Sequence, residues 1–276
     1  MRWAERQLAM LREMGVRLWL PPGEAAPRAE APAATVAEGS AALAVTPRVA
    51  PAPAPAAAPV PAAAARPLLQ QPSRGPASGV VGVATLGWPA LREAVAACTA
   101  CALCNNRRQT VFGVGSERAH WMVVGEAPGE QEDIQGEPFV GKSGQLLDNM
   151  LQALGLTRGA ADPAQQVYIA NTLKCRPPGN RNPAPEELAQ CEAFLIRQVQ
   201  LLQPRIILAM GAFAVKSLLR STEPVGRLRG RVHHYQGAPL IVTYHPAYLL
   251  RNPADKARAW DDLCLAAETV QAGSSR

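Results

Sequence analysis

Four short apolar runs stand out in the second half of the chain. They are Trp121–Val124, Val167–Ala170, Arg205–Met210 and Leu240–Tyr244. Apolar residues fill almost every position of each run and leave no polar face, which is typical of strands covered on both sides. The pattern therefore predicts four buried strands.

Helical patterns separate these strands. Apolar residues recur at helical spacing over residues 144–154, 185–202 and 212–219, and a similar segment over 88–97 precedes the first strand. Strands that alternate with helices favour a parallel sheet with helices on both faces. We expect an α/β protein, a three-layer α/β/α sandwich around a four-stranded parallel sheet. In residues 230–240 we expect a hairpin, with a short strand and a turn before the last buried strand.

The first third of the chain has a different composition. Of 276 residues 26 are proline, and residues 21–76 consist largely of Ala, Pro and Val. Such a segment buries little apolar surface and is typical of an extended linker. We divide the chain into a short amphipathic helix (1–20), an Ala/Pro-rich disordered linker (21–87) and a globular domain (88–276). The N-terminal helix is a candidate contact for an unknown protein partner.

Charge and hydropathy restrict the protein's location and partners. Charged residues interrupt the N-terminal segment every few positions, so it fits neither a signal peptide nor a membrane span. We therefore expect a cytoplasmic protein without a membrane partner. The net charge of +6 does not by itself indicate nucleic-acid binding, but basic clusters in predicted loops, such as Arg227–Arg231, suit a phosphate backbone.

Four of the six cysteines form a split set. Cys98 and Cys101 are a C-x-x-C pair, and Cys175 and Cys191 follow far downstream with fifteen residues between them. Without signs of secretion, this set favours an iron–sulfur cluster or Zn²⁺ over disulfides. Cys104 extends the first pair towards a ferredoxin-like run, but that run lacks its fourth cysteine and the following proline. A redox protein is therefore a less favoured alternative.

Residues with functional potential follow the predicted strands. Gly125–Gly129 comes after the first strand, Asn171 after the second, Gly211 after the third and His245 after the fourth. Ligands bind at the carboxyl edge of an open parallel sheet. An acid (Glu126), an amide and an imidazole are therefore expected to share one crevice.

One motif points to a chemistry that its context does not support. Gly136–Ser143 matches the P-loop pattern G-x-x-x-x-G-K-[ST]. It does not follow a buried strand directly, and no later strand ends in the Asp that would help to hold Mg²⁺. We expect no ATPase activity, although Lys142 and Ser143 at a helix start suit an anion such as a DNA phosphate.

Four ordered motifs resemble a known family. They are Gly125–Asp133, Pro138–Leu147, Asn171–Pro178 and His245–Arg251, and together with the cysteine spacing they resemble the family 4 uracil-DNA glycosylases, the iron–sulfur type of bacteria and archaea. The resemblance runs from about Trp88 to Ala267. It implies a uracil-DNA glycosylase-like fold, a [4Fe–4S] cluster on Cys98, Cys101, Cys175 and Cys191, and hydrolysis of the bond between uracil and deoxyribose in DNA during base excision repair.

The resemblance also implies roles for residues in the crevice. Phe139 resembles the ring that stacks on the flipped base, and Asn171 the amide that reads the uracil edge, with Ala127 and Gly129 beside the base. His245 resembles the donor to uracil O2, where negative charge develops as the bond breaks. Packing in the core is the alternative for Phe139.

The residue that positions the water is left open. Better-known relatives outside this family have an Asp where this chain has Ala127. Glu126 and Asn180 are the two candidates here.

Further residues are expected to touch DNA. The predicted contacts are Lys142, Ser143, Arg176, Leu249 and Arg251. Leu249 or Leu250 would fill the gap left by the flipped base, or would simply begin the final helix.

We expect a monomer that acts on uracil in single- or double-stranded DNA. The main alternative is a non-catalytic or product-trapping uracil-DNA-binding protein. Relatives that trap the product use a histidine in an inserted loop, and Arg176–Pro183 contains no histidine.

Overall fold

The computed structural model describes residues 82–274. The predicted N-terminal helix and linker residues 21–81 lie outside this range. Packed structure begins ahead of the predicted boundary at Trp88. Val83, in a 3₁₀ turn (η1, Val83–Thr85), is buried in the core, and the Leu86 carbonyl accepts a hydrogen bond of 2.7 Å from Arg197 Nε.

The centre of the domain is a six-stranded mixed sheet in the order β1-β3-β2-β4-β6-β5. The predicted fold class is confirmed at the level of an α/β protein, but the prediction of a four-stranded parallel sheet was incomplete. The four predicted strands form the parallel centre, β3-β2-β4-β6, and an antiparallel strand flanks it at each edge. The strands are β1 (Val114–Gly115), β2 (Trp121–Gly125), β3 (Val167–Asn171), β4 (Ile206–Met210), β5 (Val232–Tyr235) and β6 (Ala238–Thr243).

The two edge strands are short and have no continuous apolar run. β1 has two half-buried residues, and half-exposed β5 reaches the sheet through a hairpin with β6. Gln236 and Gly237 turn the hairpin with φ of 49° and 83°, the left-handed pair of a type I′ turn. The hairpin that the sequence predicted over 230–240 is therefore confirmed.

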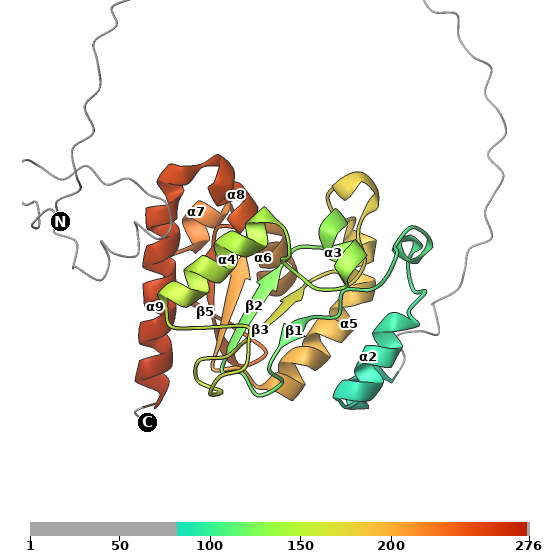
Figure 1. The fold of residues 1–276 in the computed structure, drawn as a ribbon, viewed down its shortest axis with the longest axis horizontal. Coiled ribbons are helices and arrows are strands. Elements are labelled where there is room, and N and C mark those ends of the chain that lie inside the picture. The colour runs from blue at the N-terminus through green and yellow to red at the C-terminus, as the bar shows by residue number, and fades with distance from the viewer. Residues whose placement is uncertain (1–81, 275–276) are drawn as a thin grey trace, which may run out of the picture. The chain divides into compact units, whose positions relative to one another are not determined.

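Helices cover both faces of the sheet (Figure 1). The cluster on one face packs α2, α5 and α6 against side chains such as Tyr168 and Ala170, while α4, α8 and α9 pack on the other face against Val167 and Ile169. Alternate residues of β3 thus enter opposite cores, as the period of a strand requires. The helices are α2 (Trp88–Ala96), α3 (Glu130–Gln135), α4 (Lys142–Ala153), α5 (Pro185–Leu202), α6 (Ala212–Leu219), α7 (Val225–Leu228), α8 (Pro246–Arg251) and α9 (Lys256–Ser274).

Single turns of 3₁₀ helix lie in several connections. Besides η1 they are η2 (Ala102–Asn105), η3 (Pro178–Asn180) and η4 (Pro253–Asp255). Over residues 82–274, no helix combines the length and the apolar character that a bilayer crossing requires.

Candidate active site

A cavity of about 310 Å³ lies beyond the carboxyl ends of the central strands. β2 is the switch point of the sheet, because β3 pairs with one side of it and β4 with the other. Eight of the predicted site residues line this cavity, namely Glu126, Ala127, Gly129, Phe139, Ser143, Asn171, Asn180 and His245.

The last residues of the parallel strands β2 and β3 lie side by side at the cavity. Gly125 is in register with Asn171, whose side chain is buried beneath the cavity. A Cβ on Gly125 would lie 2.5 Å from Asn171 Oδ1 and 2.6 Å from the Phe139 ring. Glycine at this position therefore leaves the space that the amide and the ring occupy. Within residues 82–274 the Asn171 amide makes no hydrogen bond to another side chain or to the backbone.

Phe139 is held in an unusual backbone conformation. Its φ is 56°, in the left-handed region that side chains with a Cβ rarely adopt. The ring stacks on His245, with 5.3 Å between ring centroids and 26° between planes. At Gly144, on α4, a Cβ would overlap the Phe139 carbonyl. The start of α4 thus fixes the Phe139 backbone by close approach.

Glu132 joins two loops of the cavity and was not predicted as a site residue. Its Oε2 accepts a hydrogen bond of 3.0 Å from Gly129 N, and its Oε1 accepts one of 3.0 Å from Val140 N. One carboxylate therefore ties the loop after β2 to the loop that carries Phe139. A Glu three residues after a glycine at a helix start is the sequence signal that could have revealed it.

His245 is fixed as a neutral donor. Its Nδ1 accepts a hydrogen bond of 3.1 Å from Ala247 N at the start of α8. The proton of the neutral ring must then reside on Nε2. Burial, and to a lesser degree the nearby Arg251, lowers the pKa of His245 to about 4. The imidazole is therefore uncharged at neutral pH.

Glu126 also lines the cavity. Its carbonyl accepts hydrogen bonds from Thr172 Oγ1 (2.5 Å) and Leu173 N (3.1 Å), which fix the loop after β2 against the loop after β3. Burial raises the pKa of its carboxyl group to about 6. Glu126 is thus mainly ionised at pH 7 and close to titration.

The loop after Cys175 contributes one predicted and one unpredicted polar group. Exposed Asn180 accepts a hydrogen bond of 2.7 Å from Arg176 Nε, so Arg176 stands beside the cavity but does not line it. Arg181 lines the cavity and forms a bidentate ion pair with Glu187, with N–O distances of 2.9 and 2.5 Å. Arg181 was not singled out as a site residue, because an Arg in a loop has many possible partners.

The predicted DNA contacts have different positions. Lys142 and Arg251 are exposed, and Ser143 is half-buried at the cavity. Leu249 has no exposed surface and packs in the core beside α4 and α9, so its prediction as a DNA contact was wrong. Leu250, the next residue of α8, is 43% exposed. The two leucines are neighbours on α8 but point to different sides of the helix, one into the core and one to the surface.

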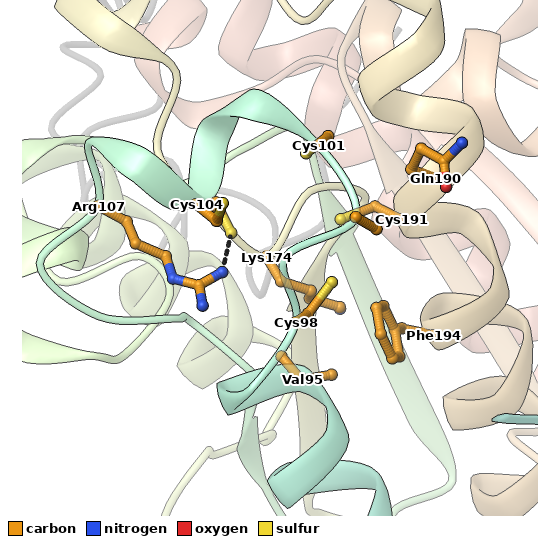
Figure 2. Close-up of a pocket in the computed structure, with 11 residues that line it drawn as sticks. Val95, Cys98, Cys101, Cys104, Arg107, Lys174, Gln190, Cys191 and Phe194 are labelled. Atoms are coloured by element: carbon orange, nitrogen blue, oxygen red, sulfur yellow. Dashed lines mark hydrogen bonds between the residues drawn. The ribbon is translucent and has the colours of Figure 1, made fainter. Parts of the chain in front are cut away.

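The four predicted metal ligands gather around a second, smaller cavity. Cys98, Cys101, Cys175 and Cys191 line it together with Cys104, and they come from the loop after α2, the loop after β3 and α5. Figure 2 shows Cys98, Cys101, Cys104 and Cys191 around this cavity. Arg107 NH1 donates a hydrogen bond of 3.0 Å to Cys175 Sγ. Among residues 82–274, no group of three or more His, Cys, Asp or Glu is arranged to hold a single metal ion.

The sequence profile of the uracil DNA glycosylase superfamily matches residues 112–264. The chain belongs to this superfamily. The match contains both Cys175 and Cys191 and the residues around the larger cavity, and it begins after Cys98 and Cys101.

Proteins named type-4 uracil-DNA glycosylases are similar to this chain. The protein of Thermotoga maritima is 42% identical over 168 residues, which are 60% of this chain and 84% of that protein. The protein of Archaeoglobus fulgidus is 40% identical over 58% of this chain and 81% of its own length. The protein of Pyrobaculum aerophilum is 41% identical over 63% of this chain and 90% of its own length.

Proposed function

We propose that the protein is a uracil-DNA glycosylase, which hydrolyses the bond between uracil and deoxyribose in DNA and leaves an abasic site for base excision repair. The observation that carries the proposal is one cavity lined by an amide, an aromatic ring and a neutral imidazole, those of Asn171, Phe139 and His245. The names of the type-4 relatives support the same activity.

The cavity suits a base taken out of the DNA stack. Enzymes that act on a base in DNA flip it into a pocket, stack it on an aromatic side chain and read its edge by hydrogen bonds. The Asn171 amide can accept from uracil N3–H and donate to O4, whereas cytosine offers an acceptor and a donor at these places. Cytosine would therefore leave buried polar groups unpaired, which is costly.

His245 and Glu126 stabilise the charges that develop as the glycosidic bond breaks. As the glycosidic bond breaks, negative charge collects on uracil O2 and positive charge on the sugar. The Nε2–H of His245 donates to O2 at that stage, and the fixed neutral tautomer needs no proton rearrangement. The Glu126 carboxylate faces the sugar, stabilises its positive charge and orients the attacking water, with Asn180 as the alternative water ligand.

The cysteine cavity fits a [4Fe–4S] cluster better than one metal ion. A single tetrahedral ion with metal–sulfur bonds of about 2.3 Å draws its four sulfurs to one point, and these cysteines line a cavity without such a point. A cluster distributes its thiolate ligands over several irons. Cys98, Cys101, Cys175 and Cys191 would hold it, and its contribution would be to fix the loop that carries Asn180 and Arg181.

The rim of the base cavity is suited to DNA. Lys142, Arg176 and Arg251 supply positive charge. Ser143 lies at the start of α4. Leu250 presents an exposed apolar side chain on α8, the helix that begins after His245. We propose that the enzyme engages DNA as a monomer.

Incubation with an oligonucleotide that contains one uracil, followed by alkaline cleavage at abasic sites, tests the proposal. The wild-type protein should cut at uracil and leave a matched cytosine oligonucleotide intact. Asn171→Ala and His245→Ala should retain the fold, judged by circular dichroism, and lose most single-turnover cleavage. An adduct with DNA that survives denaturing electrophoresis would instead identify a product-trapping protein, and unchanged rates in both variants would refute the assigned site.

A further inference from the structure

Lys174 is a fully buried lysine between the two cavities. It follows β3 by three residues and is 1% exposed. Its ammonium donates a hydrogen bond of 2.9 Å to the carbonyl of Asn171 and one of 2.7 Å to Gln198 Oε1. No carboxylate pairs with it within residues 82–274.

The same residue also belongs to the wall of the cysteine cavity. Lys174 lines that cavity beside Cys175, and its side chain lies among the cysteine side chains in Figure 2. Lys174 therefore contacts the proposed cluster ligands on one side and the proposed base reader on the other.

Packing alone does not explain a lysine here. An ammonium in a buried site costs considerable free energy unless its hydrogen bonds are satisfied, and a Met side chain would fill similar space without that cost. What the lysine adds is a donor to the Asn171 carbonyl. Gln198, which is itself fully buried, fixes the ammonium from the far side and donates to the Phe112 carbonyl (2.9 Å) and Tyr168 OH (3.0 Å).

The Asn171 backbone is thereby fixed from two directions. Thr172 N donates to the Gly125 carbonyl (3.0 Å) on the side of β2, and the Lys174 ammonium holds the Asn171 carbonyl on the side of the cysteines. Within the described residues the Asn171 amide has no partner of its own, so its position depends on this backbone.

We propose that Lys174 is a positioning residue that couples the cysteine cavity to base recognition by holding the backbone of Asn171. The inference rests on the proposed function, because it takes Asn171 as the group that reads uracil. Lys174 itself does not touch the base.

The test compares two buried variants of the full-length, iron-loaded protein. Lys174→Met removes the donor to Asn171. Tyr168→Phe is the matched control, since it removes a buried hydroxyl of the same network that is hydrogen-bonded to Gln198 and to neither Lys174 nor Asn171. The readout is the Kd of free uracil measured by calorimetry, together with iron content and melting temperature. A binding measurement reports on the base pocket without DNA contacts or turnover.

Both variants should melt at a lower temperature than the wild type. Lys174→Met should bind uracil about tenfold more weakly at equal iron content, the effect of roughly one misplaced hydrogen bond. Tyr168→Phe should stay within about twofold of the wild type. Equal Kd values in all three proteins, or equal weakening in both variants, would overturn the proposal.

A second measurement serves if Lys174→Met does not fold. The chain has four lysines, and Lys174 is the buried one, whereas Lys142 and Lys216 are exposed and Lys256 is half-buried. In wild-type protein labelled with ¹⁵N-lysine, the slowly exchanging ammonium signal should shift when uracil saturates the site, and an unmoved signal would overturn the coupling. A wild type that neither binds nor excises uracil would instead refute the proposed function.

Discussion

Burial favours the neutral form of two titratable groups of the base cavity, Glu126 and His245. It raises the pKa of Glu126 to about 6 and lowers that of His245 to about 4, so each neutral form is favoured over its charged form. At neutral pH the outcome differs, since Glu126 has lost its proton and His245 has not gained one. The cavity then contains an anionic carboxylate and an uncharged hydrogen-bond donor.

The two pKa values predict how kcat/KM falls on the acid side of the pH profile. The carboxylate of Glu126 is the active form, so kcat/KM should fall as pH drops below about 6, while His245 stays neutral down to about 4. Glu126→Gln should lower the neutral-pH rate by about 10²-fold or more and flatten the profile between pH 6 and pH 4. Single-turnover rates measured across this range provide the check. A limb near pH 6 that persists in Glu126→Gln would show that another group titrates.

Residue types and their places after strands were enough to predict most of the cavity. Glu126, Asn171 and His245 carry chemistry in their own side chains and follow apolar runs, so a pattern can reveal them. Glu132 works by accepting two backbone N–H groups, and Arg181 is placed by its ion pair with Glu187, which depend on contacts made only in the folded chain. A Glu three residues after a helix-start glycine hints at the first of these contacts, but nothing in the sequence pattern indicates the contact to Val140 N or the partner of Arg181.

At the scale of elements, the start of α4 determines the shape of the aromatic platform. The helix begins at Lys142, and its close contact at Gly144 holds Phe139 at a positive φ. A left-handed conformation at a residue with a Cβ costs of order 1 kcal/mol or more. Only surroundings that fix the loop from both ends can maintain it, and Glu132 and α4 provide the two ends.

A pair of glycine substitutions tests this contact. Gly144→Ala should cost about 1–3 kcal/mol of unfolding free energy, because the new methyl group overlaps the Phe139 carbonyl, and it should also weaken uracil binding. In Gly141→Ala the methyl group meets open space, so only the weaker N-cap preference of alanine counts, below about 1 kcal/mol. Urea denaturation and uracil calorimetry on both variants give the comparison. Similar losses in the two would contradict the role given to Gly144.

The two leucines of helix α8 are expected to have different roles, Leu249 in folding stability and Leu250 in DNA binding. Leu249→Ala should cost about 2–5 kcal/mol, because a fully buried leucine leaves a cavity in the core. Leu250→Ala should leave the melting temperature nearly unchanged and slow excision from duplex more than from single-stranded DNA, since only a duplex has a gap to fill. Melting curves and parallel assays on both substrates measure this. Equal slowing on the two substrates would rule out Leu250 as the wedge.

At the scale of the whole domain, the cysteines connect segments that are far apart in sequence. The loop after α2, the loop after β3 and helix α5 meet at one cavity, and they do so beside the residues that line the base cavity. The resemblance and the cysteine spacing predicted a metal site that joins these distant segments, and the four predicted ligands do line one cavity, but they gave no sign that Lys174 would line it as well. Likewise, four continuous apolar runs predicted the centre of the sheet, while β1 and β5 depend on pairing partners rather than on their own composition.

The proposed ligand set predicts how single cysteines differ. Cys191→Ser should lose iron and lower the melting temperature by roughly 5–10 °C, since a structural centre stabilises the fold by a few kcal/mol. Cys264→Ser, on α9 and away from the cysteine cavity, should retain both. Cys104→Ser should also retain iron although Cys104 lines the cavity. Bleached absorbance in Cys104→Ser would revise the ligand set.

The missing side chain at Gly125 has a further consequence. A methyl group there would collide with both the Asn171 amide and the Phe139 ring, so it would displace the two side chains proposed to hold a flipped base. The basic rim and Leu250 lie elsewhere and would be unaffected. Gly125→Ala should then still bind DNA but not hold a flipped nucleotide. With this variant, movement along DNA could be measured separately from base flipping.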